Sequence, residues 1–444
     1  MVIPIRISIS QLRQRSIALL PDSNYSILLL LLCSFYIKME FETYTLQNGI
    51  RLVHKRVDSP VAHCGIIIET GSRDEKDNEH GLAHLVEHLL FKGTAKRRAY
   101  HILSRMEDVG SEINAYTTKE ETCVYSTFFK DYYSRALELM GDIIFNSVYP
   151  AREMEKEKDV ILDEINSCKD SPYDLIFDEF EELAYDGNSI GHSILGEEKY
   201  LKSFTREDIL RFIGNNYHTD EMVVSSVGSI RFDKLVKLSE RFFGTQPAKR
   251  QKGERTFKEN YRAFNKTIEK KTYQVHCVMG NLAYNVKDEK RYALYLLNNL
   301  LGGPGLNSRL NMSLREKSGY AYNVDSTYNA YSDTGIINIY FGTDKTDLKK
   351  SIRIVDRELN LLKNKPLSRL QLVKAKKQLT GHIAISSEIN ENLMFSMGKS
   401  MLIFNRVDTL RIITEKIESM TADLLMEVAN EVFDPEKMSY LIYV

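Results

Sequence analysis

Three short segments from the first half of the chain recur in the second half at an almost constant offset. The pairs are VAHC at 61–64 with QVHC at 274–277, HLVEHLL at 84–90 with YLLNNLL at 295–301, and ETCVYSTFF at 121–129 with DTGIINIYF at 333–341. The offsets lie between 211 and 213 residues. Such a steady spacing indicates a duplicated unit, so the chain has to build the same kind of hydrophobic core twice.

Strand-like and helix-like patterns alternate within the first copy. Asn48-Gly49 is a typical two-residue hairpin turn between alternating segments. Residues 61–70 read as a β-rich run, and residues 111–129 hold two further alternating segments around a polar turn. We therefore expect an α+β protein of two structurally homologous domains, each a mixed, mostly antiparallel sheet with helices packed on one face.

The best linker in the chain is the stretch at 246–260, which is polar, charged and free of apolar periodicity. Segments of this composition connect domains more often than they form elements. The first domain is then expected to span residues 39–245, and the second domain residues 261–444.

Residues 1–38 differ from the rest of the chain. Their apolar run at 26–37 has 12 residues, which is too short to cross a bilayer. No A-x-A-like cleavage site follows the run, and Met39 opens a clean strand pattern. We interpret residues 1–38 as a non-domain extension upstream of the natural start; a signal peptide or membrane anchor is the alternative.

Charge and cysteine content narrow the class of function and the compartment. Sixty basic residues against 61 acidic ones leave a net charge of −1, so no basic surface for nucleic acid is expected. The five cysteines are odd in number and form no C-x-x-C pair, which favours a reducing compartment. We expect a cytoplasmic protein, or an exported or membrane-anchored one if residues 1–38 are real.

The stretch NEHGLAHLVEHLLFKG at 78–93 predicts one amphipathic helix with Asn78 as its N-cap. His84 and His88 are four residues apart, so both imidazoles project from one face, and Glu87 lies on nearly the same face. Two neutral imidazoles can hold a zinc ion and a water beside a carboxylate base, in the order H-x-x-E-H. A solvated helix surface is the alternative, but the apolar residues between them predict a packed helix, where unpaired polar groups are costly.

The second copy has lost these groups. Tyr295, Asn298 and Asn299 stand at the equivalent positions, so we expect the second domain to be free of metal. In the first copy, His80 lies about 12 Å along the helix axis from His88, too far to share one tetrahedral ion. We expect His80 on the solvent or substrate side.

HLVEHLLFKGT, followed by NAYT and then EKDVILDE, resembles the pitrilysin and mitochondrial-processing-peptidase family of inverzincin zinc metallopeptidases, in its small two-domain bacterial form. The likeness runs from Phe41 to the C-terminus. It implies a zinc-dependent endopeptidase that hydrolyses peptides or unfolded segments. It also implies a third zinc ligand, Glu164, which ends the EKDVILDE match 76 residues after His88. Glu157, seven residues earlier, would support the site, the alternative being an exposed charge.

The resemblance also implies roles for residues that contact the peptide. Asn114 and Ala115 would lie in a strand that adds the substrate along its edge, although an inner strand is equally compatible with the pattern. Arg315 and Tyr322 would reach the substrate from the second half, with Tyr322 donating to the oxyanion. A helix-end ion pair and a core tyrosine are the alternatives for this last pair.

The same resemblance implies how the chain assembles. Four such domains enclose a chamber in the family, so we expect a homodimer, with a heterodimer containing a metal-free sister chain as the rival. The glycine-rich stretch at 301–308 lacks the Lys-Ser/Thr ending of a phosphate loop, so no nucleotide is expected. The main alternative function is a non-catalytic assembly subunit of the same fold.

Overall fold

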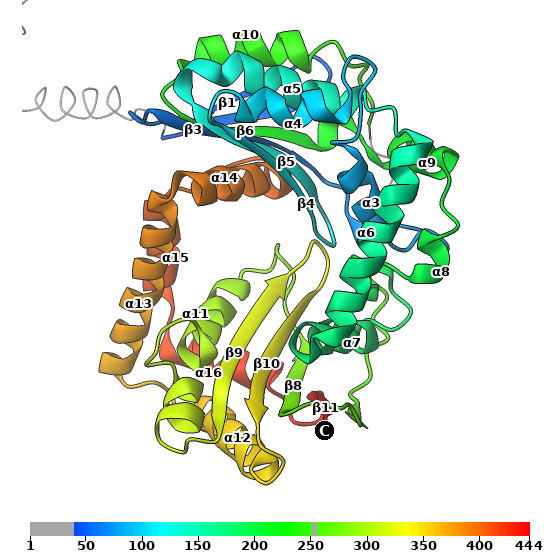
Figure 1. Ribbon diagram of the computed structural model, residues 1–444. Helices are drawn as coiled ribbons and strands as arrows, with labels where there is room; N and C mark the ends of the chain where they lie inside the picture. Colours follow the sequence, from blue (N-terminus) through cyan, green and yellow to red (C-terminus); the bar gives the residue numbers. More distant parts are fainter. Residues whose placement is uncertain (1–39, 251–254) are drawn as a thin grey trace, which may run out of the picture. The chain divides into compact units, whose positions relative to one another are not determined.

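The computed structural model describes residues 40–250 and 255–444. The first sheet has six strands in the order β1-β2-β6-β3-β5-β4 (Figure 1). β2 and β6 run parallel, whereas β3 is antiparallel to β6 and β5, and β4 is antiparallel to β5. The strands are β1 Glu42–Thr45, β2 Arg51–Arg56, β3 Val61–Ile68, β4 Glu112–Thr117, β5 Thr122–Phe129 and β6 Met222–Gly228.

The second sheet has five strands in the order β7-β11-β8-β10-β9. β7 and β11 run parallel, and the other neighbours are antiparallel. The strands are β7 Asn265–Ile268, β8 Val275–Leu282, β9 Ala321–Ala330, β10 Gly335–Thr343 and β11 Ser439–Tyr443.

The two sheets share one topology once β1 is set aside. Both the strand order and the direction of every neighbour are the same in β2-β6-β3-β5-β4 and in β7-β11-β8-β10-β9. The repeated sequence segments fall in equivalent elements: β3 with β8, β5 with β10, and the helix α3 with α11. The predicted α+β architecture of two homologous, mostly antiparallel sheets is therefore confirmed.

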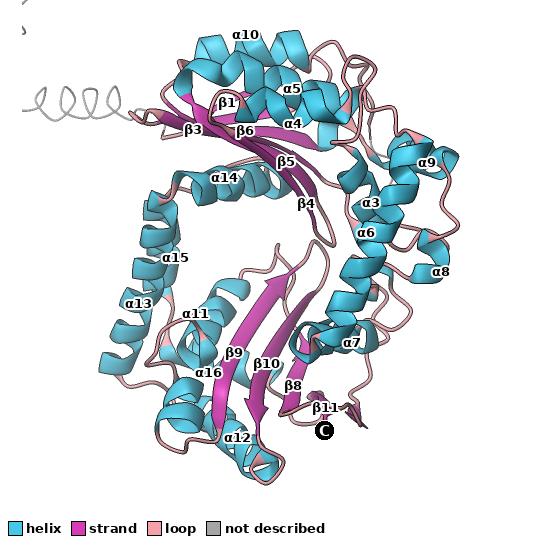
Figure 2. Ribbon diagram, in the orientation of Figure 1, coloured by secondary structure: helices cyan, strands magenta, loops and turns pink. Residues whose placement is uncertain are grey.

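Helices pack against each sheet on the face that forms the main core (Figure 2). In the first half, α5 packs on β3 and β5, and α3 packs beside β4, because the apolar residues of both helices recur at helical spacing and join the first core. The helices of the first half are α3 Leu82–Leu89, α4 Ala99–Glu107, α5 Tyr133–Phe145, α6 Ala151–Asp170, α7 Pro172–Ala184, α8 Glu198–Leu201, α9 Arg206–Asn216 and α10 Phe232–Phe242. Those of the second half are α11 Arg291–Gly302, α12 Leu348–Asn364, α13 Arg369–Glu388, α14 Asn390–Phe404, α15 Leu410–Ser419 and α16 Ala422–Val432.

Each sheet also receives one helix from the other half on its opposite face. α7 places Ile176 and Phe180 against Val278 and Leu441 of the second sheet. α14 lies on β3 and β6 of the first sheet, where Ser225 Oγ donates to the Met394 carbonyl at 2.6 Å (Figure 1). Double coverage explains why β6 and β10 are buried along their whole length instead of alternating between core and solvent.

The apolar run at 26–37 lies outside the described residues. Within residues 40–250 and 255–444, no helix is both long enough and apolar enough to span a membrane.

Candidate metal centre

The helix that carries the H-x-x-E-H motif is shorter than its sequence pattern predicted. α3 begins at Leu82 after Gly81, whose φ of 95° is left-handed, so the prediction of Asn78 as N-cap was wrong. The carboxylate of Glu75 takes the place of a cap, because its two oxygens accept from the Gly81 N–H at 3.0 Å and the Ala83 N–H at 2.7 Å. Sequence rules for capping consider the residues directly before a helix. They therefore did not identify Glu75, which lies six residues before Gly81.

Two faces of α3 have different roles. Leu82, Leu85, Val86 and Leu89 are buried in the first core at a spacing of three and four residues. The opposite face carries the two histidines and the glutamate of the motif. Packing on one side therefore fixes the direction in which the polar side chains point.

The three predicted zinc ligands converge. Glu164 Oε2 lies 3.8 Å from His84 Nε2 and 3.7 Å from His88 Nε2. One donor atom from each residue lies within 4.8 Å of the other two. Zinc bonds of about 2.1 Å in a tetrahedral arrangement place ligand atoms roughly 3.4 Å apart, so the donor set fits a zinc ion with a small contraction.

Glu164 reaches the motif because α6 lies alongside α3 (Figure 1). Glu157 is two turns earlier on α6 and almost buried, which excludes the alternative of an exposed charge. Its Oε2 lies 3.1 Å from His88 Nδ1, and its Oε1 lies 2.7 Å from Lys92 Nζ. This contact orients the His88 ring so that Nε2 faces Glu164.

Burial changes the protonation of the site in two directions. It lowers the pKa of His84 to about 4, and the neighbouring His88 adds to this effect, so His84 is in the neutral form that binds metal. Burial raises the pKa of Glu87, and the charge of Glu164 raises it further, while Thr117 and His88 oppose the shift. His84 Nδ1 is buried without a hydrogen-bond partner among the described residues, so packing alone orients that ring.

Asn114 and Ala115 lie in β4, which is the last strand of the first sheet. Among the described residues, β5 is the only strand that pairs with β4, so β4 is an edge strand of this sheet and not an inner one. α3 packs against β4, and a pocket of about 270 Å³ lined by Asn114 opens beside the strand. The free edge of β4 therefore runs next to the helix that carries the motif.

Arg315 and Tyr322 lie together but away from this cluster. The guanidinium carbon of Arg315 is 5.5 Å from the centre of the Tyr322 ring, and Tyr322 is 72% exposed, so it is not a core tyrosine. In the described part of the chain, no hydrogen bond or ion pair joins either residue to His84, His88 or Glu164.

His80 does not face solvent or substrate, so that expectation was wrong. It is 6% exposed and stacks on His192 with ring centres 3.7 Å apart. Its Nδ1 lies 3.4 Å from Glu197 Oε1. His80 belongs to the packing that surrounds the start of α3.

Family models match both halves of the chain. The model described as "Insulinase (Peptidase family M16)" matches residues 52–198, and that described as "Peptidase M16 inactive domain" matches residues 203–379. A relative from Bacillus subtilis, "Uncharacterized zinc protease YmxG", is 32% identical over 402 residues, which cover 90% of this chain and 97% of the relative. The chain belongs to peptidase family M16. The match to the inactive-domain model includes Tyr295, Asn298 and Asn299, which stand at the positions equivalent to His84, Glu87 and His88.

Other similar proteins have almost the same length as this chain. An "Uncharacterized zinc protease" from Rickettsia felis is 32% identical over 412 residues, which cover 91% of this chain and 98% of the relative. The crystal structure of a protease from Helicobacter pylori superposes with a TM-score of 0.84 at 21% identity, covering 91% of this chain and 99% of that one. The structure of a peptidase M16 inactive domain from Pseudomonas fluorescens gives a TM-score of 0.85 at 20% identity, with coverage of 91% and 98%. These two likenesses establish the fold of the small two-domain M16 proteins.

Proposed function

We propose that this M16 chain is a zinc-dependent endopeptidase in which His84, His88 and Glu164 hold the ion and Glu87 is the catalytic base. The observation that carries the proposal is the convergence of three donor atoms within 4.8 Å beside a carboxylate on the same helix. The names of the relatives, which describe zinc proteases, agree with it.

The residues of the chain divide the chemistry among them. A zinc ion held by this donor set would supply the Lewis acidity that polarises a carbonyl and lowers the pKa of water. Glu87 takes the proton from the attacking water and returns it to the leaving amine. Burial raises the pKa of Glu87, which makes its carboxylate a stronger base for this transfer. Glu157 holds the His88 ring through Nδ1.

The free edge of β4 is the proposed substrate site. An extended peptide can add to this edge through backbone hydrogen bonds, with Asn114 and Ala115 beside it. Backbone pairing accepts many sequences, so the substrates expected are peptides and unfolded segments. A folded protein keeps most of its backbone groups hydrogen-bonded within its own elements, so it is a poorer partner for this edge.

Arg315 and Tyr322 are proposed to act on the substrate held by a second copy of the chain. Tyr322 lies near the start of β9. The turn that follows the end of β9 contacts the first half of the same chain through Asp333. Eight residues of strand separate Tyr322 from Ala330, or roughly 26 Å. A homodimer would bring Tyr322 to the oxyanion from the partner copy, and a metal-free sister chain is the rival partner.

The decisive experiment compares E87Q with H84A in the purified chain. E87Q retains all three ligands but loses the base, so we expect full zinc content and a fall in peptide cleavage of about 100-fold or more. H84A loses a ligand, so both zinc content and cleavage should fall. Zinc is measured by atomic absorption and cleavage on a mixed peptide library with and without chelator.

The outcome also separates the enzyme from the assembly subunit. Undiminished cleavage by zinc-loaded E87Q would refute the role of Glu87. A wild-type chain that holds zinc but cleaves no peptide in the library would instead favour a non-catalytic subunit of the same fold.

A further inference from the structure

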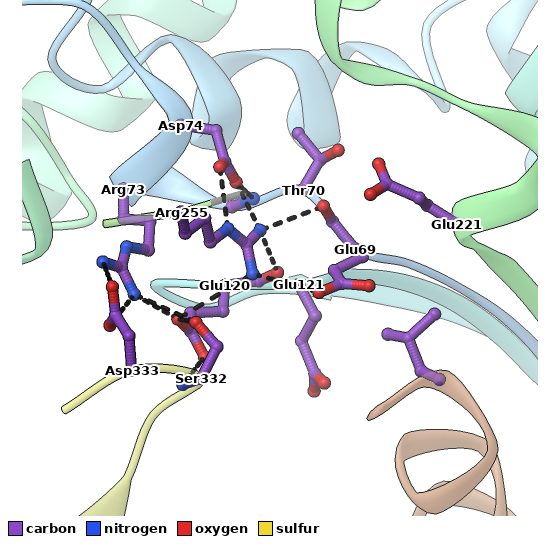
Figure 3. Close-up of polar contacts among 12 residues, drawn as sticks. Glu69, Thr70, Arg73, Asp74, Glu120, Glu121, Glu221, Arg255, Ser332 and Asp333 are labelled. Atoms are coloured by element: carbon purple, nitrogen blue, oxygen red, sulfur yellow. Dashed lines mark hydrogen bonds and ion pairs between the residues drawn. The ribbon is translucent and has the colours of Figure 1, made fainter. Parts of the chain in front are cut away.

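The turn between β9 and β10 joins the metal-free half to the first half at two residues. Asp333 accepts from Arg73 through both carboxylate oxygens, at 2.9 Å and 3.0 Å (Figure 3). Ser332 donates to Glu120 through its backbone N–H at 2.9 Å and through its hydroxyl at 2.6 Å. Arg73 also donates to Glu120. We call Arg73, Glu120, Ser332 and Asp333 the clasp.

The clasp residues of the first half, Arg73 and Glu120, lie next to the two elements of the proposed site, α3 and β4. Arg73 belongs to the short 3-10 helix Ser72–Asp74, which leads into α3, and Glu120 belongs to the turn that follows β4. These segments are bonded to one another, because the Ser72 N–H donates to the Thr118 carbonyl at 3.1 Å and the Arg73 N–H to the Lys119 carbonyl at 2.9 Å. The clasp therefore sits where the metal helix and the substrate strand are tied together.

A short path of contacts leads from the clasp to the metal helix. Glu75 follows Arg73 by two residues and is the carboxylate that accepts from the first amides of α3. Between them, Asp74 accepts from Arg255 at 2.9 Å and 2.7 Å (Figure 3). Arg73 and Arg255 together thus hold the segment that carries the capping carboxylate.

The ion pair in the clasp is buried enough to resist displacement by water. The side chain of Arg73 is 4% exposed and that of Asp333 is 20% exposed. Burial by itself would lower the pKa of Arg73, but hydrogen bonds and charges from Asp333 and Glu120 raise it overall, so the guanidinium stays charged. Removal of Asp333 would leave that buried charge with Glu120 as its remaining acidic partner, a costly change that the loop can relieve only by moving.

We propose that Asp333 is a positioning residue of the metal-free half, which holds the metal helix and strand β4 in their relative positions through Arg73. This role rests on the proposed function. It gives the second half a part in the site although that half has none of the metal ligands. Two paired nitrogens and oxygens fix an orientation as well as a distance, which a single contact would not do.

The test measures zinc affinity and kinetics in full-length D333A. We expect zinc affinity, measured by competition with a chromophoric chelator, to fall about tenfold, as for other residues that orient ligands without binding the metal. The visible absorption of the cobalt-substituted protein should change as well, and kcat should fall more than KM rises. D333N keeps one acceptor for Arg73 and should give an intermediate affinity.

The matched control is D347A. Asp347 lies in the same half and forms an exposed pair with Lys350 at 2.7 Å, so its loss should leave every readout at the wild-type value. The proposal is overturned if D333A and D333N match D347A within twofold in affinity, spectrum and kcat. If D333A does not fold, D333N alone decides by the same comparison. If the wild-type chain binds no zinc, the proposed function itself is wrong. If the wild type binds zinc and cleaves peptide and D333A does the same, only the role of the clasp is wrong.

Discussion

At the scale of single residues, the carboxylate of Glu157 connects two groups, the His88 imidazole and the Lys92 ammonium. It contacts the His88 ring at 3.1 Å and the Lys92 ammonium at 2.7 Å, so it both orients the imidazole and is itself held in place. His84 has no such partner on its Nδ1 among the described residues. The two histidines should therefore depend on different support, with His88 relying on Glu157 and His84 on packing.

This difference predicts the effect of E157A. Loss of the carboxylate frees the His88 ring, and we expect zinc affinity to fall by about tenfold to 100-fold, with all three ligands still present. Competition with a chelator measures the change. E153A is the control on the same helix, because Glu153 pairs with Lys156 at the surface and should not alter affinity. Equal affinities of E157A and E153A would contradict the supporting role of Glu157.

Sequence reasoning at this scale predicts which side chains lie together when they are close in the chain. His84, Glu87 and His88 are recognisable because a helix turns their spacing directly into geometry, and the resemblance supplied Glu164 and Glu157 as matched positions. Glu75 was missed and His80 was placed wrongly, because their roles depend on contacts across loops, with the amides of Gly81 and Ala83 in one case and with the His192 ring in the other.

At the scale of elements, α3 is a short helix whose start is fixed from outside. Gly81 cannot carry a side chain, since a Cβ atom there would lie 2.8 Å from the Leu195 carbonyl oxygen and φ is 95°. Its helix has no side-chain cap of its own, so the first amides depend on the buried Glu75. Only two turns separate this start from His88, which makes the ligands sensitive to fraying.

E75Q tests this dependence with almost no change in size. The amide retains one acceptor oxygen and presents an NH₂ group to the other backbone N–H, so one of the two hydrogen bonds is lost and a donor faces a donor. We expect the free energy of unfolding to fall by about 1–3 kcal/mol, and zinc affinity to fall with it. Denaturant unfolding and hydrogen exchange at Gly81 and Ala83 measure the two parts.

E79Q is the matched control for this substitution. Glu79 is also buried and lies in the same loop, but its carboxylate accepts from Lys76 N and Arg211 instead of from α3. E75Q and E79Q could lose the same stability while hydrogen exchange at the start of α3 stays unchanged. This result would show that Glu75 acts only as a buried acidic group and not as a cap.

The pairing of elements was predictable only in part. The repeat located the equivalent strands β3 with β8 and β5 with β10, because their alternation survives in both copies. The parallel pairing of β2 with β6 joins residues such as Arg51 and Val223, and no local pattern records that contact. The N-cap of α3 is Gly81 instead of the predicted Asn78, because loop contacts outweighed a favourable N-cap residue.

At the scale of the whole molecule, α7 of the first half packs on the second sheet, and α14 of the second half packs on the first sheet. Both follow a 20-residue helix, α6 or α13, and both cover the sheet of the other half. Periodicity shows that a helix has a face to bury but not which sheet will cover it. This exchange was therefore absent from the predicted architecture, although the duplicated fold itself was expected correctly.

Leucine should have opposite effects on stability at two glycines, Gly398 in α14, which packs against the first sheet, and Gly381 in α13. A side chain at Gly398 would overlap Ile67 and approach Ser225 Cβ at 3.0 Å, so G398L should destabilise the protein by about 1–3 kcal/mol or more. Gly381 in α13 has open space where a Cβ would lie, so G381L should stabilise it by up to about 1 kcal/mol through helix propensity. Denaturant unfolding of both variants gives the sign, and a neutral G398L would contradict the close packing.

Each half contributes one helix, α7 or α14, to the sheet of the other half, and this has a consequence for the origin of such a chain. An ancestor with one copy of the unit would leave an apolar sheet face bare as a monomer, and it could cover that face only by pairing with its twin and swapping the helix. Fusion of two genes would then turn a contact between subunits into a contact within one polypeptide. In such a fused chain, metal ligands in one copy alone would be enough for one site, in agreement with Tyr295, Asn298 and Asn299 in the second copy.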